Sequence, residues 1–386
     1  MAAIVVTPSD TRQRIHALDG LRGIAIVVVV LSHGSARLWP VENVSGIGPF
    51  EGLFWSGSLG VTILFIVSAF VATQGMLESH TGWSWVDPLR LYLRRFIRIG
   101  VQLYPLLLAV LALSAWDSTD TSSVVTTQDS VLSVGSYTWN WYLENHVFTA
   151  RADLGHLWYL SVEFQFYVAL VLAVALLGRR HRRHLIPALI GLIVAVDVWR
   201  LHVFHVEGWY RATLRTTTRM DAPLLGVLIA LSLPYLQRYR RYAQPAAWLS
   251  GAVMAAIVLT SSGHTPFDYL LTQGIVFSIA AAVFVAAILM CPASSNLILL
   301  LGSVALRTIG TAALAIYLWH VPLFLTLSRH TTHWDWVPRT LLGFGLLAAI
   351  VVTAQLLIER PAQRWLGRHL RPPRREPVSD AYRAAD

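Results

Sequence analysis

The chain has no lysine and a single cysteine, Cys291, among its 386 residues. One cysteine excludes an intramolecular disulfide and any metal cluster built on cysteine. Charged residues are also scarce, at 13% of the chain, whereas soluble domains carry about 25%. Hydrophobic residues make up 55% of the sequence, and the mean hydropathy is +0.56. This composition is typical of a polytopic membrane protein and excludes an ordinary soluble domain.

Apolar runs recur along the chain, each close to the length of about 17–25 residues that crosses a bilayer as a helix. They lie at about 23–40, 58–78, 100–116, 157–178, 185–205, 221–236, 246–262, 270–291, 308–327 and 340–358. We therefore expect an all-α polytopic membrane protein of about ten transmembrane helices, built as one domain over residues 14–362. The polar stretch at 117–155 is expected to be a loop.

The positive charge comes from 30 arginines. With the N-terminus inside the cell, 22 of them fall on the cytoplasmic side of the expected spans and eight on the other side. This asymmetry follows the positive-inside rule and predicts that both termini are cytoplasmic. Residues 1–13 are then a short cytoplasmic tail, and residues 363–386 are a basic, disordered one. Because the arginines cluster in short loops between apolar runs, they are interpreted as topogenic charge, and no nucleic-acid partner is expected.

An arginine and a histidine stand out on the first apolar run, LDGLRGIAIVVVVLSHG at residues 18–34. The helix from Arg22 to His33 rises about 16 Å, roughly half of the ~30 Å hydrocarbon core. If Arg22 lies at the membrane surface, His33 lies near the middle of the bilayer. Ionisable groups at that depth are costly and usually face a functional cavity, although a hydrogen-bonded packing histidine is the structural alternative.

A second group of polar residues lies in LGHLWYLSVEFQFYV, residues 154–168. On a helix, His156, Tyr159 and Glu163 follow at i, i+3 and i+7 and so share one face. An interfacial aromatic belt would also account for Tyr159. A carboxylate about two turns inside a span needs a partner, and His33 would serve as that partner for Glu163.

Two further pairs lie in or beside later spans. Arg219 and Asp221 stand at the outer mouth of the sixth run, either as an interfacial ion pair or as part of a site. Tyr317 and His320 share a helical face in the ninth run, where a structural role and a catalytic role are both open. The second pair adds another imidazole within the membrane.

The arginine-rich stretch RLYLRRFIRI, residues 90–99, is amphipathic and suits a membrane surface. Its Arg95 and Arg98 share a helical face on the same side of the membrane as Arg22. They anchor the chain at the interface, or they clamp a phosphate, which guanidinium groups bind bidentately. No P-loop, zinc motif, GxSxG elbow or dinucleotide fingerprint occurs in its expected context, so no metal or permanently bound cofactor is expected.

Taken in order, these motifs resemble those of the acyltransferase-3 family, integral membrane enzymes that move acyl groups onto sugars and other hydroxyl acceptors. LDGLRGIAI followed by His33 is similar to the family's basic residue, ten-residue gap and histidine. Six later motifs of this chain resemble the family's remaining motifs in the same order: GVTILFIVSAF, RRFIRIGVQLYP, HLWYLSVEFQFY, TTTRMDAPLLG, IGTAALAIYLWHVPLF and LIERP. The resemblance covers about residues 14–362. One departure is Phe164, which follows Glu163 where the family usually has a second glutamate. Some members carry an extracytoplasmic SGNH hydrolase-like domain, and we expect the form without it.

The resemblance implies an O-acyltransferase of the cell membrane, with acyl-CoA, acetyl-CoA by default, as a cytoplasmic co-substrate. His33 would act as general base toward the acceptor hydroxyl while Glu163 holds its tautomer, or His33 would carry the acyl group as a transient acyl-histidine. The donor would be bound by Arg22, Arg95 and Arg98. The acceptor cavity would be lined by His156, Tyr159, Arg219, Asp221, Tyr317 and His320.

Several alternatives stay open at this point. The carbohydrate acceptor could be an envelope polysaccharide, a lipid-linked glycan or a secreted glycosylated metabolite. A secondary transporter also uses intramembrane His, Glu and Arg, although the sequence shows no inverted repeat and no paired broken helices. A non-catalytic membrane partner in envelope assembly would tolerate replacement of both His33 and Glu163.

Overall fold

The chain folds into helices. The computed structural model describes residues 8–39, 48–78, 86–177, 182–261 and 271–370, and within these ranges no strand occurs. Eight helical segments of the described chain are long and apolar enough to cross a membrane, or up to nine if a bent pair counts as one span. The predicted all-α, multi-pass fold is confirmed.

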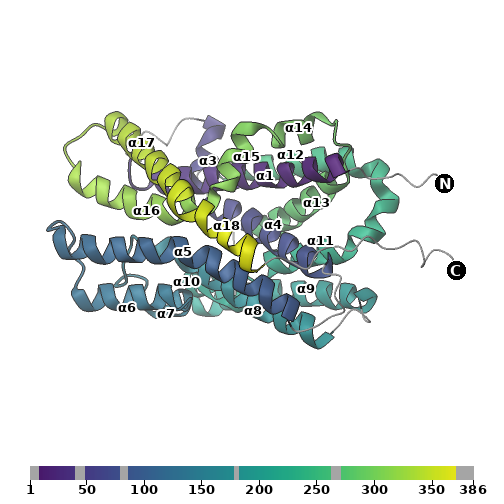
Figure 1. Cartoon of the computed structure of the whole chain (residues 1–386), viewed down its shortest axis with the longest axis horizontal. Coiled ribbons are helices and arrows are strands. Elements are labelled where there is room, and N and C mark those ends of the chain that lie inside the picture. The colour runs from purple at the N-terminus through teal and green to yellow at the C-terminus, as the bar shows by residue number, and fades with distance from the viewer. Residues whose placement is uncertain (1–7, 40–47, 79–85, 178–181, 262–270, 371–386) are drawn as a thin grey trace.

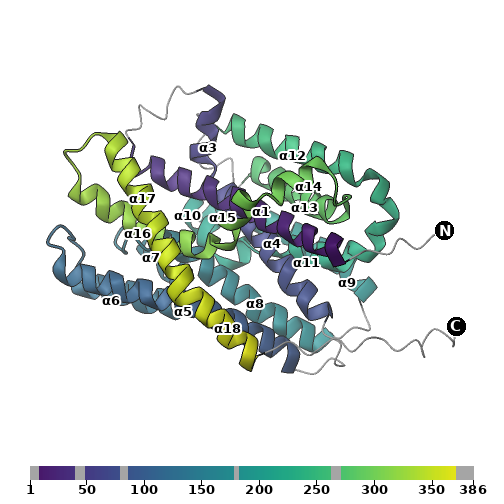
Figure 2. The ribbon, with the colours of Figure 1, turned by 45° about the horizontal axis from the view of Figure 1, so that its top comes forward.

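The expected apolar runs all correspond to helices. The long helices are α1 (Pro8–Ser35), α4 (Gly57–Glu78), α5 (Val86–Trp116), α8 (Trp158–Leu177), α9 (Arg182–Glu207), α11 (Asp221–Leu236), α12 (Ala243–Thr260), α13 (Thr272–Met290), α16 (Ala313–His330) and α17 (Trp336–Ala354). Helices α11 and α12 belong to one continuous 40-residue apolar segment. The 3₁₀ helix η5 (Gln237–Tyr242) separates them, and Figure 2 shows the chain turning back there.

Helix α4 lies at the centre of the bundle. Both views place it between α1 and α11 (Figures 1 and 2), and it packs against α1, α11 and α13. Its apolar segment is 78% buried within the protein, more than that of any other described span. Helices α5 and α8 run side by side along one edge of the molecule (Figure 1) and pack against each other. The polar side chains of α4, α5 and α8 therefore meet inside the protein and not in lipid.

One span is broken in its middle. The short helix α15 (Val304–Thr311) and α16 meet at an angle of 68° around Ala312. Non-helical backbone within a membrane is tolerated where it lines a cavity or is covered by protein. The break at Ala312 is therefore a candidate wall of an internal site.

Two stretches differ from their predicted structure. The stretch at 117–155 is not a plain loop, because it holds α6 (Val124–Gly135), α7 (Trp139–His146) and η2 (Gly155–Leu157). The Ser123 side chain caps α6 by accepting from the Thr126 amide, a local signal that starts a helix. The amphipathic stretch at 90–99 is continuous with the span predicted at 100–116, because both belong to α5.

The two ends of the domain are also helical beyond the predicted limits. Helix α1 begins at Pro8, within the tail expected at 1–13. At the other end, α17 continues through the π-helical turn η7 (Gln355–Glu359) into α18 (Arg360–His369). The first residues of the expected disordered tail are thus helical, and residues 371–386 lie outside the described chain.

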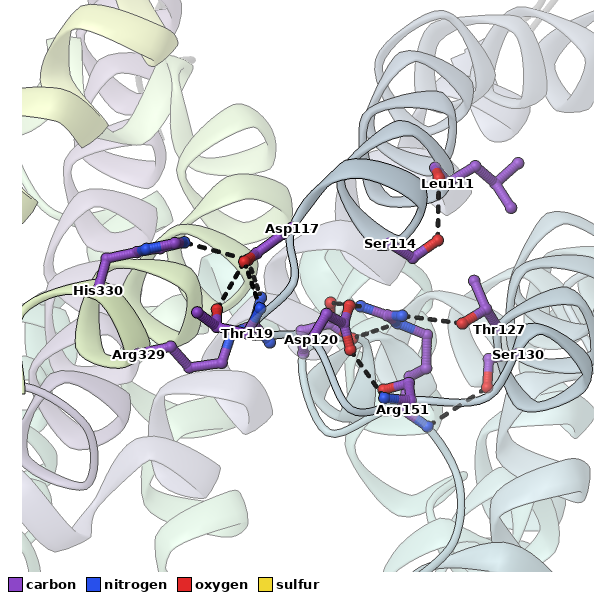
Figure 3. Close-up of polar contacts among 12 residues, drawn as sticks. Leu111, Ser114, Asp117, Thr119, Asp120, Thr127, Ser130, Arg151, Arg329 and His330 are labelled. Carbon is purple, nitrogen blue, oxygen red and sulfur yellow. Dashed lines mark hydrogen bonds and ion pairs between the residues drawn. The ribbon is translucent and has the colours of Figure 1, made fainter.

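Ion pairs hold the 117–155 segment to the helical bundle (Figure 3). Asp117, just after α5, accepts from Arg329 at 3.0 Å and contacts His330 at 3.2 Å near the end of α16. Close by, Arg151 is bound by Asp120 at 2.8 Å and by Asp153 at 2.6 Å. The two clusters together fasten α5, α6 and α16 at one end of the molecule.

Candidate active site

Close backbone contact between α1 and α15 fixes the position of Arg22. A Cβ atom built on Gly310 would overlap the carbonyl oxygen of Asp19, and one built on Gly23 would overlap that of Leu306. Small residues at such crossings allow helices to approach closely. Arg22 therefore leaves α1 next to the break between α15 and α16, where it lines a cavity together with Gly310.

This cavity has a volume of about 100 Å³, is partly open to solvent, and lies where α1, α4, α5, α8, α15 and α16 meet. Three arginines and one glutamate give its lining a formal charge of +2, which favours an anionic ligand. The first residues of α16 also line it, so the positive end of that helix dipole adds to the field. The polar lining residues are Arg22, Ser68, Arg95, Arg98, Tyr159, Glu163, Thr311 and Tyr317. We call this space the arginine-lined cavity.

Glu163 is bound by residues of the arginine-lined cavity and not by His33. Its Oε1 atom accepts hydrogen bonds from Arg95 Nη2 at 2.7 Å, from Ser68 Oγ at 2.6 Å and from the Tyr159 hydroxyl at 3.0 Å. The expected pairing of Glu163 with His33 is therefore wrong. The physical reason is that the face of α8 that carries Glu163 meets α4 and α5, which supply a hydroxyl and a guanidinium.

Phe164, the departure from the family motif, takes part in an aromatic cluster. Its ring stacks on that of Tyr137 with centroids 4.0 Å apart and an interplanar angle of 13°, and it also lies near Phe96. A second carboxylate at this position would face apolar rings without a partner. The aromatic replacement is consistent with the neighbours that this chain provides.

The two remaining arginines of the cavity are partly exposed. Arg98 pairs with Glu359 of η7 at 2.8 Å, and its side chain is 43% exposed. Arg22 pairs with Asp19 at 3.4 Å. Sequence reasoning gave Glu359 no role, although it lies in the LIERP motif. Both guanidinium groups keep part of their surface open for a ligand.

Three histidines from three elements form a cluster: His33 of α1, His156 of η2 and His320 of α16. Nδ1 of His33 lies 2.8 Å from Nε2 of His320, and the two rings stack with centroids 5.0 Å apart. The His156 ring lies edge-on, 4.9 Å from that of His320 and 6.1 Å from that of His33. Within the described chain, no three His, Cys, Asp or Glu residues form a group that could hold a metal ion. Hydrogen bonds connect these histidines to one another and to main-chain carbonyls.

Those hydrogen bonds define a tautomer for each neutral ring. Nδ1 of His320 lies 2.8 Å from the carbonyl oxygen of Tyr317 and 3.0 Å from that of Ile316. Because a carbonyl only accepts, Nδ1 carries the proton and Nε2 of His320 is an acceptor. Nδ1 of His33 must then donate to it, which leaves a lone pair on Nε2 of His33. No described residue forms a hydrogen bond with that Nε2 atom.

Tyrosines separate the histidine cluster from the arginine-lined cavity. His156 Nε2 donates to the carbonyl oxygen of Tyr317 at 2.8 Å, and the Tyr317 hydroxyl donates back to the carbonyl oxygen of His156. The Tyr317 and Tyr159 rings lie with centroids 5.4 Å apart, and both line the cavity. His33 does not line it. The tyrosine pair thus forms the inner wall of the cavity, with the histidines behind it.

Arg219 and Asp221 lie apart from this arrangement, because neither lines the arginine-lined cavity. Asp221 pairs with Arg200 of α9 at 2.9 Å and so ties α11 to α9. The Arg219 guanidinium lies over the ring of Trp158, 5.3 Å from its centroid. Sequence reasoning missed Arg200. The signal that could have found it is Asp197, which stands three residues earlier in the same apolar run and binds Arg200 at 2.7 Å.

The sequence model of the acyltransferase-3 family, described as an acyltransferase domain, matches residues 15–358. The chain belongs to the acyltransferase-3 family. All the residues predicted for the site, from Arg22 to His320, lie within the matched range. No solved structure matches this chain significantly.

Relatives of this acyltransferase-3 member include proteins named as O-acetyltransferases. A putative peptidoglycan O-acetyltransferase of Bacillus subtilis, YrhL, is 26% identical over 335 residues, which cover 81% of this chain and 49% of the relative. The peptidoglycan O-acetyltransferase OatA of Listeria monocytogenes is 27% identical over 339 residues, covering 82% and 50%. The O-acetyltransferase OatA of Staphylococcus aureus is 24% identical, covering 81% and 51%. The chain thus spans about half the length of these relatives.

Proposed function

We propose that this protein is an O-acetyltransferase of the cytoplasmic membrane, which moves an acetyl group from cytoplasmic acetyl-CoA to a hydroxyl of a carbohydrate. Family membership and the names of the relatives support the reaction class. The peptidoglycan named for two relatives supports a cell-wall glycan as the acceptor. The observation that carries the proposal is the unpaired Nε2 lone pair of His33, fixed by the hydrogen bond from its Nδ1 to His320.

The donor would be held by charge in the arginine-lined cavity. Coenzyme A carries several phosphate charges, and the partly exposed guanidinium groups of Arg22 and Arg98 offer bidentate contacts to them. Arg95 is held by Glu163 and Ser68, so it supplies a fixed positive charge and little free donor capacity. The phosphate groups of coenzyme A are then bound at the mouth of the arginine-lined cavity, and the acyl thioester points inward.

The acyl end must pass the wall formed by Tyr159 and Tyr317 to meet His33. The acceptor hydroxyl gives its proton to Nε2 of His33 while its oxygen attacks the thioester carbonyl carbon. The carbon–sulfur bond then breaks, and the departing thiolate of coenzyme A takes the proton from His33. An ester and free coenzyme A result. His320 acts through His33 by accepting from its Nδ1 and stabilising the imidazolium, as an acidic residue does in a catalytic triad.

The proposal is tested with purified protein in nanodiscs, radiolabelled acetyl-CoA and a soluble saccharide acceptor. Wild type should transfer label to the saccharide. His33→Ala should reduce transfer by about 10²–10⁴-fold, the range expected for loss of a general base. His330→Ala is the matched control, because that histidine is half exposed and contacts Asp117 far from the cluster.

Two results would contradict the proposal. If His33→Ala transfers label at the wild-type rate, His33 is not the base. If wild type transfers no label but accumulates a solute in sealed vesicles without acyl-CoA, the protein is a transporter and not an acyltransferase.

A further inference from the structure

A second cavity, of about 190 Å³, lies on the other side of η2 and the start of α8 from the arginine-lined cavity. It is formed by α7, the short helix α10 (Trp209–Leu214), η2 and the first turn of α8. Trp158, Trp209 and Tyr210 contribute aromatic rings, and Gly155 and Thr213 complete its wall. None of the residues predicted from the sequence lines it, and the mechanism above does not use it. We call it the aromatic cavity.

Thr213 lines the aromatic cavity, and no described residue pairs with its buried hydroxyl. The side chain is only 7% exposed, and its hydroxyl has no hydrogen-bond partner. Leaving a buried hydroxyl unpaired costs about 1–3 kcal/mol. A ligand with its own polar groups, bound in the cavity that Thr213 lines, could supply that partner once the threonine side chain rotates toward it.

The surroundings of the aromatic cavity are polar. Arg215, directly after α10, pairs with Glu207 at 2.8 Å and with Glu144 of α7 at 3.3 Å. Arg151, which lines the cavity, is held by Asp120 and Asp153 (Figure 3). Such a density of ion pairs belongs to the membrane–water interface and not to the hydrocarbon core. A water-borne ligand is therefore favoured over a lipid chain.

Aromatic rings beside an unpaired hydroxyl suit a sugar ring, which has an apolar C–H face and polar hydroxyl groups. The C–H face of a pyranose is apolar and packs on Trp and Tyr rings, while its hydroxyls hydrogen-bond to groups such as that of Thr213. We propose that the aromatic cavity binds a sugar ring of the acceptor. The sugar ring would then lie on one side of η2, the element that carries His156, and the arginine-lined cavity would lie on the other. This inference rests on the proposed function, since transfer to a carbohydrate is what makes a sugar the expected occupant.

A larger side chain at Gly155 should block the aromatic cavity. A Cβ atom at this position would meet nothing within 4 Å, so a larger side chain fills the space without a clash. Gly155→Leu should weaken binding of a β-1,4-linked N-acetylglucosamine tetramer at least tenfold, measured by calorimetry on nanodisc-embedded protein without donor. Thr213→Val, which removes only the unused hydroxyl, should weaken it about three- to tenfold. Gly191→Leu is the control, because a Cβ there also meets nothing within 4 Å, on the exposed surface of α9.

The outcomes separate this inference from the proposed function. Unchanged tetramer binding in Gly155→Leu would overturn the sugar site, whatever the transfer activity. Loss of a copurified phospholipid in native mass spectra of Gly155→Leu, with tetramer binding intact, would assign the cavity to lipid instead. Tetramer binding that depends on Gly155 and Thr213, in a protein that transfers no acetyl group, would leave the sugar site standing and remove the proposed reaction.

Discussion

The chemistry of the site depends on which partner holds each ionisable side chain. Oε1 of Glu163 accepts hydrogen bonds from Arg95, Ser68 and Tyr159, so the carboxylate fixes the charge of Arg95 at the arginine-lined cavity. In the proposed mechanism, the role of orienting His33 falls to His320, whose own Nδ1 is fixed by main-chain carbonyls. A histidine replaces a carboxylate in that role, which keeps the pair neutral before reaction. This arrangement avoids burying a negative charge in the membrane.

Two substitutions of His320 distinguish orientation from packing. His320→Ala removes the acceptor of the His33 Nδ1 proton, and kcat should fall about 100-fold while the KM for acetyl-CoA stays within twofold. His320→Gln places an amide oxygen where it can accept the same hydrogen bond, and it should recover part of the lost rate. Steady-state kinetics on both variants provide the check. Equal loss in the two variants, or a raised donor KM, would mean that His320 only supports the packing of the cavity.

At the scale of elements, the sequence predicted much of the fold because apolar length is a strong local signal. The expected spans all appear as helices, and Arg22, Arg95 and Arg98 do line one cavity. Helical spacing shows which residues share a face, as for His156 and Glu163. It does not show which other helix that face meets. The pairing of His33 with His320, 287 residues away, depends on contacts between α1 and α16 that no local pattern encodes.

The contact between α1 and α15 leads to a prediction about Gly310. A methyl group there would overlap the carbonyl oxygen of Asp19, so Gly310→Ala must push the two helices apart. We expect a loss of about 1–3 kcal/mol in stability, typical of overpacking, together with a raised KM for acetyl-CoA as Arg22 moves. Thermal unfolding in detergent and donor kinetics measure the two effects.

The control for this prediction is Gly345→Ala on the exposed face of α17, where an added Cβ meets nothing within 4 Å. That variant should be as stable as wild type or slightly more so, because alanine favours helix over glycine by roughly 0.5–1 kcal/mol. If both alanine variants behave alike, the close approach of α1 to α15 is not needed.

At the scale of the whole molecule, Asp117 joins distant parts of the chain. Hydrogen bonds from Thr119, together with the contacts to His330 and Arg329, hold the pKa of Asp117 well below its usual range. A lowered pKa in the folded state stabilises the protein above the unfolded pKa of about 3.9, and this contribution is lost as the pH falls toward the folded pKa. Asp117→Asn should therefore lower Tm by a few degrees at pH 7. The deficit should shrink below about pH 4, where Asp117 of the unfolded wild type becomes protonated. A deficit of unchanged size at pH 3 would mean that the charge of Asp117 does not stabilise this contact.

The molecule as a whole has two cavities with different linings, and the charge of the arginine-lined cavity predicts a sided reaction. The lining of the arginine-lined cavity carries a formal charge of +2, and Arg98 at its mouth is 43% exposed. Coenzyme A is too highly charged to cross a bilayer, so in sealed vesicles acetyl-CoA should support transfer only from the side that these arginines face. The positive-inside rule predicts that this is the cytoplasmic side. With acetyl-CoA added outside, inverted vesicles should therefore be active and right-side-out vesicles inactive. Arg98→Ala should raise the KM for acetyl-CoA about tenfold at unchanged kcat, equivalent to ~1.4 kcal/mol of binding. Arg364→Ala, on the exposed surface of α18 and outside the cavity, should leave that KM unchanged. Equal activity from both vesicle orientations would place the donor site elsewhere, because a cavity reached from one side only cannot use a donor supplied from the other.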